Sequence, residues 1–249
     1  MENSIKFLFS GDSALVIEFG NEISVDINKK IRKMMDNIKK ENIDGIIELV
    51  PTYCSLLVNY DVLKVDYQSL VEKLKTLLND DNETVEDEEV TLIEIPTLYN
   101  DECGPDLSYV AEYNKLSKEE VIKIHTGTDY LVYMLGFMPG FTYLGGMSEK
   151  IATPRLESPR LQIYPGSVGI AGKQTGMYPS MSPGGWRIIG RTPLKLYNPD
   201  SETPVYISSG DYIRYVSISE EEYNNILKKV ESNEYKLNIH KVKRGELNA

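Results

Sequence analysis

Apolar positions in the first third of the chain follow the period of strands and then the period of helices. Short apolar runs flank the turn sequence SGDS and predict a β-hairpin. Later segments place an apolar residue at every third or fourth position, as amphipathic helices do. The predicted elements are strands at 5–9 and 14–19, a helix at 24–40, strands at 46–50 and 53–60, and a helix capped by Asp66. We therefore expect residues 1–78 to form an α+β domain, a two-layer α/β sandwich.

An acidic run separates this block from the rest of the chain. Residues 79–90, NDDNETVEDEEV, hold seven acidic residues and no basic one. This composition is typical of a solvated connector, so it predicts a linker and a domain boundary. A docking tail for a basic partner is the alternative, although such runs are commonly just solvated.

Residues 91–249 are predicted to form a second domain of many short strands. The capping boxes Ser117-x-x-Glu120 and Ser219-x-x-Glu222 mark the starts of two helices. Close spacing of strand and turn signals is typical of a closed or nearly closed β-barrel. The predicted elements are strands at 91–95 and 130–135, helices at 106–115 and from 117 toward 125, strands at 193–198, 204–207, 211–218 and 235–239, a helix near 220–231, and a frayed end at 241–249.

One stretch of this second domain, residues 136–193, is unusually rich in glycine and proline. It holds eleven of the 18 glycines, seven of the 12 prolines and the only tryptophan, Trp186. Glycine reaches positive φ and permits close approach, whereas proline fixes φ and cannot donate to a ladder. Because aromatic and aliphatic residues lie between them, the combination predicts tight turns and bulges on a rigid β scaffold rather than a flexible linker.

The same stretch is basic although the protein is acidic. Residues 150–195 carry seven Lys or Arg and a single acid, Glu157, while the formal net charge of the chain is −11. Arginine suits bidentate capture of a carboxylate or phosphate, and lysine suits a point contact. We expect a site for a small anion or an acidic partner; pairing with acids elsewhere in the chain is the alternative. The candidate cations are Arg155, Arg160, Lys173, Arg187 and Arg191.

Neutral and aromatic side chains accompany these cations. Gln174, Thr175 and Tyr178 offer neutral hydrogen bonds beside Lys173. The aromatic residues of the stretch could stack on a ligand, but the pattern favours barrel core. They are Phe137, Phe141, Tyr143 and Trp186.

His125 precedes the strand that leads into this stretch. Its ordinary pKa near ~6.5 suits proton transfer or contact with an anion. Equally, a histidine at a helix C-terminus can serve only to meet the helix dipole. The residues alone leave these two roles open.

The sequence lacks the motifs of several other classes of protein. A nucleotide P-loop around Lys173 fails, because Ser167 stands where glycine is required and Gln174 where serine or threonine is required. Cys54 and Cys103 form no CxxC pair, which favours reduced thiols in a cytoplasmic protein without a structural metal. Because the sequence has no apolar run of ~20 residues, we expect no transmembrane helix, and because its first residues lack a basic region followed by a long apolar core, we expect no secretory signal. The pI of about 4.8 argues against broad nucleic-acid binding.

Four motifs inside the Gly/Pro-rich stretch resemble a known family. They are GFMPGFTYLGG (136–146), ATPR (152–155), PGSVGIAGKQTGMYP (165–179) and SPGGWRIIGRTP (182–193). In this order they resemble the KipI-like family, which includes the B subunit of 5-oxoprolinase and allophanate hydrolase subunit 1. The resemblance extends weakly through 12–20 and 48–61, so it covers most of the chain. It implies a cyclophilin-like β-barrel for residues 91–249.

The resemblance also implies an activity and partners. It suggests one component of an ATP-dependent amide-hydrolysing complex, most simply one that converts 5-oxo-L-proline to L-glutamate with ATP as co-substrate. The expected partners are the C-type component of 5-oxoprolinase, similar to allophanate hydrolase subunit 2, and the A-type component. Little activity is expected from this chain alone. Allophanate hydrolysis and KipI-like inhibition of a sensor histidine kinase are the alternatives.

The resemblance assigns roles to the candidate residues. Because the family carries a histidine at the matching place, it favours proton transfer for His125. The substrate-orienting residues implied are Gln174, Tyr178 and Trp186. The cations expected to hold a carboxylate or phosphoryl group and to stabilise developing negative charge are Arg155, Arg160, Lys173 and Arg191.

Overall fold

The computed structural model describes residues 5–78 and 89–248 and contains two compact units, Met1–Thr84 and Val85–Ala249. Each unit has its own hydrophobic core. The predicted linker at 79–90 lies, up to residue 88, outside the described residues. Its last two residues, Glu89 and Val90, already belong to the first strand of the second unit. Within the described residues no helix is both long and apolar enough to span a bilayer.

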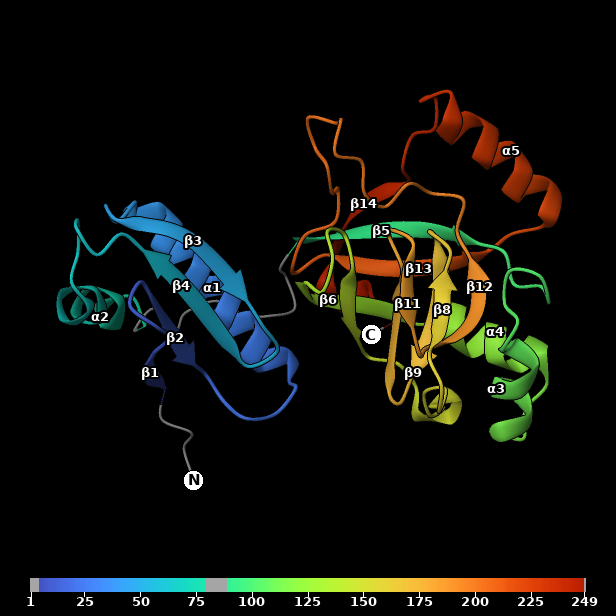
Figure 1. Ribbon diagram of the computed structural model, residues 1–249, viewed down its shortest axis with the longest axis horizontal. Coiled ribbons are helices and arrows are strands. Elements are labelled where there is room, and N and C mark those ends of the chain that lie inside the picture. The colour runs from blue at the N-terminus through green and yellow to red at the C-terminus, as the bar shows by residue number, and fades with distance from the viewer. Residues whose placement is uncertain (1–4, 79–88, 249) are drawn as a thin grey trace. The chain divides into compact units, whose positions relative to one another are not determined.

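The first unit is a four-stranded antiparallel sheet in the order β1-β2-β4-β3, with two helices. Its elements are β1 Lys6–Phe9, β2 Ala14–Glu18, α1 Val25–Glu41, β3 Ile46–Pro51, β4 Ser55–Tyr60 and α2 Tyr67–Thr76. Alternate residues of the central strands, such as Leu15 and Leu56, share one core with Ile31 of α1 and Leu70 of α2. Both helices therefore cover the same face of the sheet (Figure 1). The elements predicted for this block are confirmed.

Local chemistry explains where these helices begin and end. The Asp66 carboxylate accepts from the backbone N–H of Ser69 over 3.0 Å and caps α2 as predicted. Helix α1 ends at Glu41, and its C-cap, Asn42, adopts the left-handed conformation with φ 48°.

The second unit is a mixed α+β structure with several sheets. Strands of a five-stranded sheet follow the order β14-β5-β13-β6-β7, a three-stranded sheet the order β10-β9-β12, and β11 pairs with β8. The strands are β5 Glu89–Thr97, β6 Asp129–Leu135, β7 Thr142–Gly145, β8 Arg160–Ile163, β9 Ser167–Ala171, β10 Gln174–Met177, β11 Ser182–Gly184, β12 Arg187–Arg191, β13 Tyr212–Ser217 and β14 Ile239–Lys243. The helices are α3 Leu107–Tyr113, α4 Lys118–Thr126 and α5 Glu220–Glu231, with short 3-10 helices η2 Glu149–Ile151 and η3 Arg244–Glu246.

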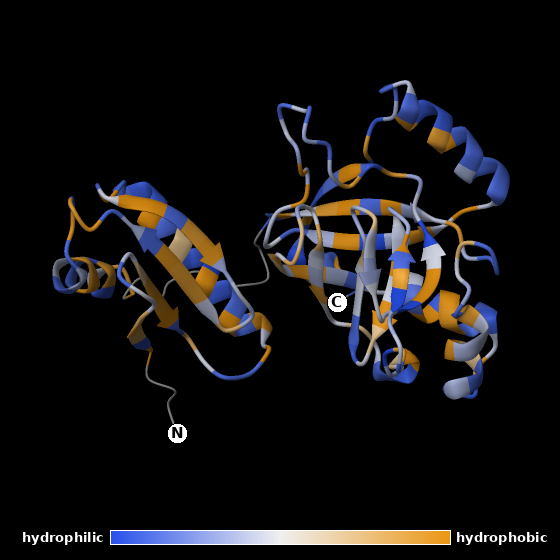
Figure 2. Ribbon diagram, viewed as in Figure 1, coloured by the Kyte–Doolittle hydropathy of each residue, from blue (hydrophilic) through white to orange (hydrophobic). Residues whose placement is uncertain are grey.

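Strands and helices of this unit enclose one main core. Strand β5 runs parallel to β13, and both contribute buried residues such as Ile95 and Ile213. Helix α3 packs against β12 and α4 against β13 (Figure 1). Figure 2 shows β5 as mainly hydrophobic, whereas α5, which has no buried residue, is mainly hydrophilic. Both predicted capping boxes are confirmed, at Ser117 and Ser219.

Two predicted strands are wrong, and a third is displaced. Residues 193–198 and 204–207 form no strand, although Leu194, Leu196 and Ile207 are buried. Their prolines cannot donate to a ladder, and the segment folds back on itself through a bond from the Asn198 N–H to the Pro204 carbonyl oxygen.

The last strand is displaced relative to the prediction. It begins at Ile239 and ends at Lys243, rather than covering 235–239, so the end predicted to be frayed holds β14 and η3. Tyr235 and Leu237 pack against the core without pairing in a sheet. Their apolar character therefore reflects burial and not strand structure. The true strand carries lysines, which are typical of an edge strand and conceal its strand character.

Candidate functional site

Three arginines meet where the loop after η2 approaches strand β12. Arg155 lies on that loop, Arg160 begins β8 and Arg187 begins β12. The Nε of Arg187 donates to the carbonyl oxygen of Pro154 over 3.3 Å, which ties the start of β12 to the residue before Arg155. We call Arg155, Arg160 and Arg187 the arginine group.

A single buried carboxylate, Asp106, holds two members of this group. Its side chain is 7% exposed. Both terminal nitrogens of the Arg160 guanidinium face it: Nη2 donates to Oδ1 over 2.9 Å, and Nη1 lies 2.9 Å from Oδ2 in the ion pair. Nη1 of Arg187 lies 3.8 Å from Oδ1, and the backbone N–H of Ile188 donates to Oδ2 over 2.7 Å. One carboxylate therefore faces two guanidinium groups, and the site retains excess positive charge.

The turn before α3 brings Asp106 to this position. A Cβ added at Gly104 would lie 2.1 Å from the carbonyl oxygen of Ile189, so the turn can pass β12 only with glycine there. The Asp106 N–H then donates to the carbonyl oxygen of Ile188 over 2.9 Å. The Asp106 side chain makes no cap for α3, because it is engaged with the arginines and with Ile188.

Aromatic rings support the arginine group. Trp186 is buried and meets Phe141 edge-on at 5.6 Å between ring centroids. The guanidinium carbon of Arg155 lies 5.9 Å from the Trp186 ring centroid, and that of Arg187 lies 3.7 Å from the Tyr109 ring centroid. These distances allow cation–π attraction, strongest for Arg187.

The aromatic residues predicted as core follow that prediction in part. Phe141 and Trp186 are buried in a satellite cluster with Tyr178, and Tyr143 packs against it. Phe137 departs from the prediction, because its side chain is 68% exposed. It stands on a loop whose backbone directs it away from the core.

Tyr178 meets Trp186 edge-on at 6.2 Å between ring centroids, and the charges of Arg155 and Arg160 act on its hydroxyl. Burial raises the pKa of Tyr178 to about 12, although the charges of Arg155 and Arg160 oppose that rise. The phenol therefore keeps its proton at neutral pH and can act as a donor. A Cβ added at Gly184 would lie 2.5 Å from the hydroxyl oxygen, so this glycine makes room for it.

The other predicted site residues lie outside the contacts that join the arginine group. Lys173 lies in the turn between β9 and β10, and Gln174 begins β10. Lys173 forms an ion pair with Glu149, and both side chains of that pair are largely exposed. Arg191, at the end of β12, places its guanidinium carbon 4.9 Å from the Tyr164 ring centroid. The roles predicted for Lys173, Gln174 and Arg191 stay predictions.

His125 lies in the core and is fully buried. Its Nε2 lies 2.8 Å from Oγ1 of Thr175, and its Nδ1 lies 2.8 Å from the hydroxyl of Tyr99. Because Thr175 donates its hydroxyl proton to the Gly169 carbonyl oxygen, the Nε2 of His125 must be the donor to Thr175. Nδ1 then accepts from Tyr99, so the imidazole is neutral and both nitrogens are satisfied.

This environment favours a structural role for His125. The Tyr215 ring lies 4.5 Å from the imidazole by centroids, and the Tyr130 hydroxyl donates to the His125 carbonyl oxygen over 2.8 Å. The hydroxyl–imidazole pair with Thr175 has the spacing of a nucleophile and its base, but Nε2 is the donor in this pair and both residues are closed to solvent. Proton transfer by His125 stays a prediction.

Replacing His125 by glutamine is expected to alter the pH dependence of stability. Burial lowers the pKa of His125 from 6.5 to about 3. Between those values the unfolded chain binds a proton that the folded chain does not, so the free energy of unfolding falls as pH falls. The contribution is at most about 1.4 kcal/mol per pH unit. Urea denaturation from about pH 7.5 to about pH 4.5 should show the stability advantage of wild type over His125→Gln shrinking toward acid.

The control for this measurement is His240→Gln, since the His240 side chain is 43% exposed. An advantage of wild type over His125→Gln that does not change with pH would contradict a neutral, buried imidazole.

Sequence reasoning missed Asp106 and Tyr109. Asp106 stands at the start of a predicted helix, where an aspartate usually caps the helix. The neighbouring residues therefore gave no sign that it would instead hold the arginines. The available signal was the preceding Gly-Pro pair, which indicates a tight turn. Among residues 5–78 and 89–248, no group of three His, Cys, Asp or Glu side chains is placed to hold a metal ion.

Comparison with known proteins identifies the family. The carboxyltransferase domain, subdomain C and D, matches residues 5–207. The B subunit of 5-oxoprolinase from Bacillus subtilis is 46% identical over 223 residues, which cover 86% of this chain and 93% of that protein.

Solved structures agree with this match. TTHA0988, whose crystal structure is known, is 32% identical in sequence, and its structure superposes with a TM-score of 0.73. The match covers 83% of this chain and 40% of the TTHA0988 chain. The Kluyveromyces lactis urea carboxylase, at 18% identity and a TM-score of 0.77, shares the fold over 96% of this chain and 24% of its own. The four motifs predicted a relationship to the 5-oxoprolinase B subunit, and this relationship is confirmed. The chain belongs to the carboxyltransferase domain family, subdomain C and D.

Proposed function

We propose that this chain is the B subunit of a 5-oxoprolinase, a complex that hydrolyses 5-oxo-L-proline to L-glutamate at the expense of ATP. The observation that carries the proposal is the 46% identity to the Bacillus subtilis protein over nearly the full length of both chains. Similarity of this extent covers both units of the chain and is not confined to the Gly/Pro-rich stretch.

The arginine group suits the chemistry of this substrate. 5-Oxoproline carries one carboxylate, and opening its lactam with ATP creates further negative charge on oxygen. Arg155 is exposed and, among the residues that the structure describes, has no ion-pair partner, so its guanidinium is available to an anion. Arg160 and Arg187 are fixed by Asp106 and add positive potential without moving. The neutral Tyr178 hydroxyl supplies a donor beside them.

The rest of the reaction falls to partners in this proposal. The arginine group contains no nucleophile paired with a base, which fits a site that a second protein completes. We therefore propose the C-type and A-type components of 5-oxoprolinase as partners and ATP as a co-substrate of the assembled complex. Lys173, Gln174 and Arg191 would act in the reaction only if a partner brings substrate to them.

We also propose that the second unit closes into a cyclophilin-like barrel. Two contacts between its sheets support closure. Leu98, just after β5, bridges to Arg191 of β12. At the other side β7 contacts β10, where a Cβ added at Gly176 would lie 3.0 Å from the Thr142 carbonyl oxygen.

ATP hydrolysis stimulated by 5-oxo-L-proline tests the function directly. The chain is mixed with purified A-type and C-type proteins from the same organism, and a matched mixture omits this chain. We expect stimulation in the full mixture and none without the chain. Stimulation by allophanate instead of 5-oxoproline, or full activity in the mixture that lacks this chain, would contradict the proposal.

A further inference from the structure

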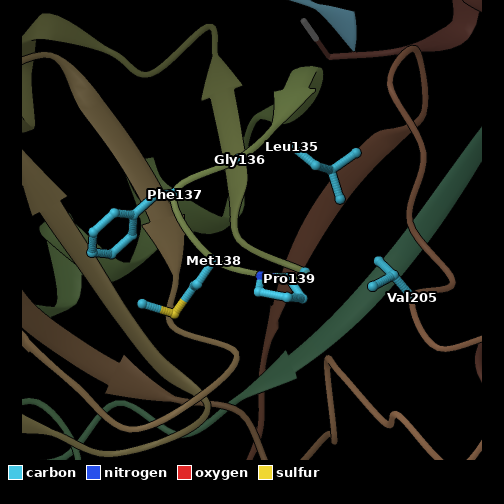
Figure 3. Close-up of a pocket in the computed structure, with 7 residues that line it drawn as sticks. Leu135, Gly136, Phe137, Met138, Pro139 and Val205 are labelled. Atoms are coloured by element: carbon cyan, nitrogen blue, oxygen red, sulfur yellow. The ribbon is translucent and has the colours of Figure 1, made fainter. Parts of the chain in front are cut away.

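The loop between β6 and β7 displays a phenylalanine to solvent. We call residues 136–141 the Phe137 loop. Its Phe137 side chain is 68% exposed, and in Figure 3 the ring projects from the loop on the side opposite to Leu135 and Val205. Large aromatic side chains that remain exposed at loop tips are enriched where proteins meet partners.

The backbone holds Phe137 in a conformation that phenylalanine rarely adopts. Its φ is 67°, in the left-handed region, and the Met138 N–H donates to the Gly136 carbonyl oxygen over 2.8 Å. Together these features define a γ-turn with positive φ, which is strained for any residue with a Cβ. Glycine would fit the same backbone without strain. A phenylalanine here is therefore unfavourable for the isolated fold.

Further hydrogen bonds keep the turn in place. The Phe141 N–H donates to the Met138 carbonyl oxygen over 3.1 Å, and the Gly136 N–H donates to the Phe141 carbonyl oxygen over 3.2 Å. Gly140, with φ 82°, lies so close to the Leu196 carbonyl oxygen that an added Cβ would be 3.0 Å from it. The ring is thus presented by a preformed loop, which reduces the entropy lost when a partner binds.

The surroundings of the loop are apolar. A shallow hollow beside it is lined without any charged side chain, by Leu135, Gly136, Phe137, Met138, Pro139, Gly140 and Val205 (Figure 3). In a chain with a formal net charge of −11, an uncharged patch around an exposed ring is suited to burial against another apolar surface.

A chain of aromatic contacts joins this loop to the arginine group. Phe137 meets Phe141 edge-on at 5.5 Å, and Phe141 meets Trp186 edge-on at 5.6 Å. Trp186 in turn lies under Arg155. A protein that covers Phe137 would therefore lie close to the proposed anion site and could complete it.

The lengths of related chains indicate what covers the loop. In TTHA0988 this chain matches only 40% of the polypeptide, so most of that relative has no counterpart here. Where the two parts belong to different chains, as in the complex proposed above, that additional part would meet this fold as a separate protein. An oxoprolinase assembled from several chains, as proposed above, supplies such a protein.

We propose that the Phe137 loop is the docking site for the C-type protein, which receives the Phe137 ring in an apolar pocket beside the arginine group. The inference rests on the proposed function, because it names where the partner in that function binds. It assigns to Phe137 a contact with protein rather than with substrate.

The test compares Phe137→Gly and Phe137→Ala in the full-length chain. The glycine variant removes the ring and relieves the positive-φ strain, so its thermal midpoint should equal or exceed that of wild type. We expect the Kd for the purified C-type protein, measured by calorimetry, to rise about 10- to 100-fold in both variants. The matched control is Phe9→Ala in the first unit, where an equally exposed phenylalanine (73%) is removed; its Kd should equal that of wild type.

The possible results distinguish failure of this inference alone from failure of the proposed function. Wild-type binding that persists unchanged in both variants would overturn the docking site and leave the function standing. Unchanged affinity for the C-type protein with a raised KM for 5-oxoproline would overturn it by placing Phe137 at the substrate. Loss of self-association in the variants, with binding of the C-type protein intact, would show that a second copy of this chain covers the loop. Absence of any binding by wild type would remove both the function and the inference.

Discussion

Asp106→Asn is expected to lower the free energy of unfolding by roughly 2–4 kcal/mol, toward the lower end of what breaking a buried ion pair costs. The asparagine amide can replace only part of the ion pair with Arg160 and of the bond from the Ile188 N–H. Arg160 would remain without its counter-ion, although its side chain is 31% exposed and water would recover part of the loss. Urea denaturation of the purified chain measures the change.

The matched control for this variant is Asp101→Asn. Asp101 also pairs with a cation, Lys118, but its side chain is 79% exposed. Exposed ion pairs contribute only about 0–1 kcal/mol, so this variant should remain close to wild type. Equal destabilisation by the two substitutions would contradict the role of Asp106 as the anchor of the arginine group.

Arg155→Ala is expected to reduce kcat/KM of the assembled complex for 5-oxoproline by about 100-fold, the typical loss when a donor to developing negative charge is removed. Stability should hardly change, because Arg155 is exposed and its described contact is the cation–π approach to Trp186. Stimulated ATP hydrolysis and thermal unfolding, measured on the same preparation, separate these two effects. Arg155→Lys should recover little, since lysine cannot form the bidentate contact.

Lys195→Ala provides the control for charge alone. Lys195 is an exposed cation whose Nζ donates to Asn198, away from the contacts of the arginine group. Its loss should leave kcat/KM unchanged. If Arg155→Ala left the stimulated activity intact, the arginine group would not be the anion site.

Elements with strong local signals were predictable from the sequence. The helical period of α1 and the side-chain caps at Asp66, Ser117 and Ser219 act over a few residues, so a linear pattern contains them. The segments at 193–207 and 235–238 were not, because their apolar residues are buried by packing while their backbone leaves the sheets. A pattern of hydrophobicity reports burial and not which backbone groups pair.

The candidate site was predictable in its cations but not in its counter-ions. The shortage of acids near Arg160 in sequence suggested unpaired charge, yet Asp106 reaches it from 54 residues earlier. Glu149 likewise pairs with Lys173. For His125 the sequence showed a titratable side chain but not its burial, which depends on contacts with Thr175 and Tyr215 from distant strands.

The position of β5 in its sheet constrains the order in which the second unit can be completed. Its parallel neighbour β13 and its antiparallel neighbour β14 both come from the last part of the chain, after all the strands around the arginine group. During synthesis, β5 emerges from the ribosome long before either neighbour exists. The first unit, whose strands and helices are all close in sequence, can fold at once, whereas the second must wait for its C-terminus with β5 unpaired.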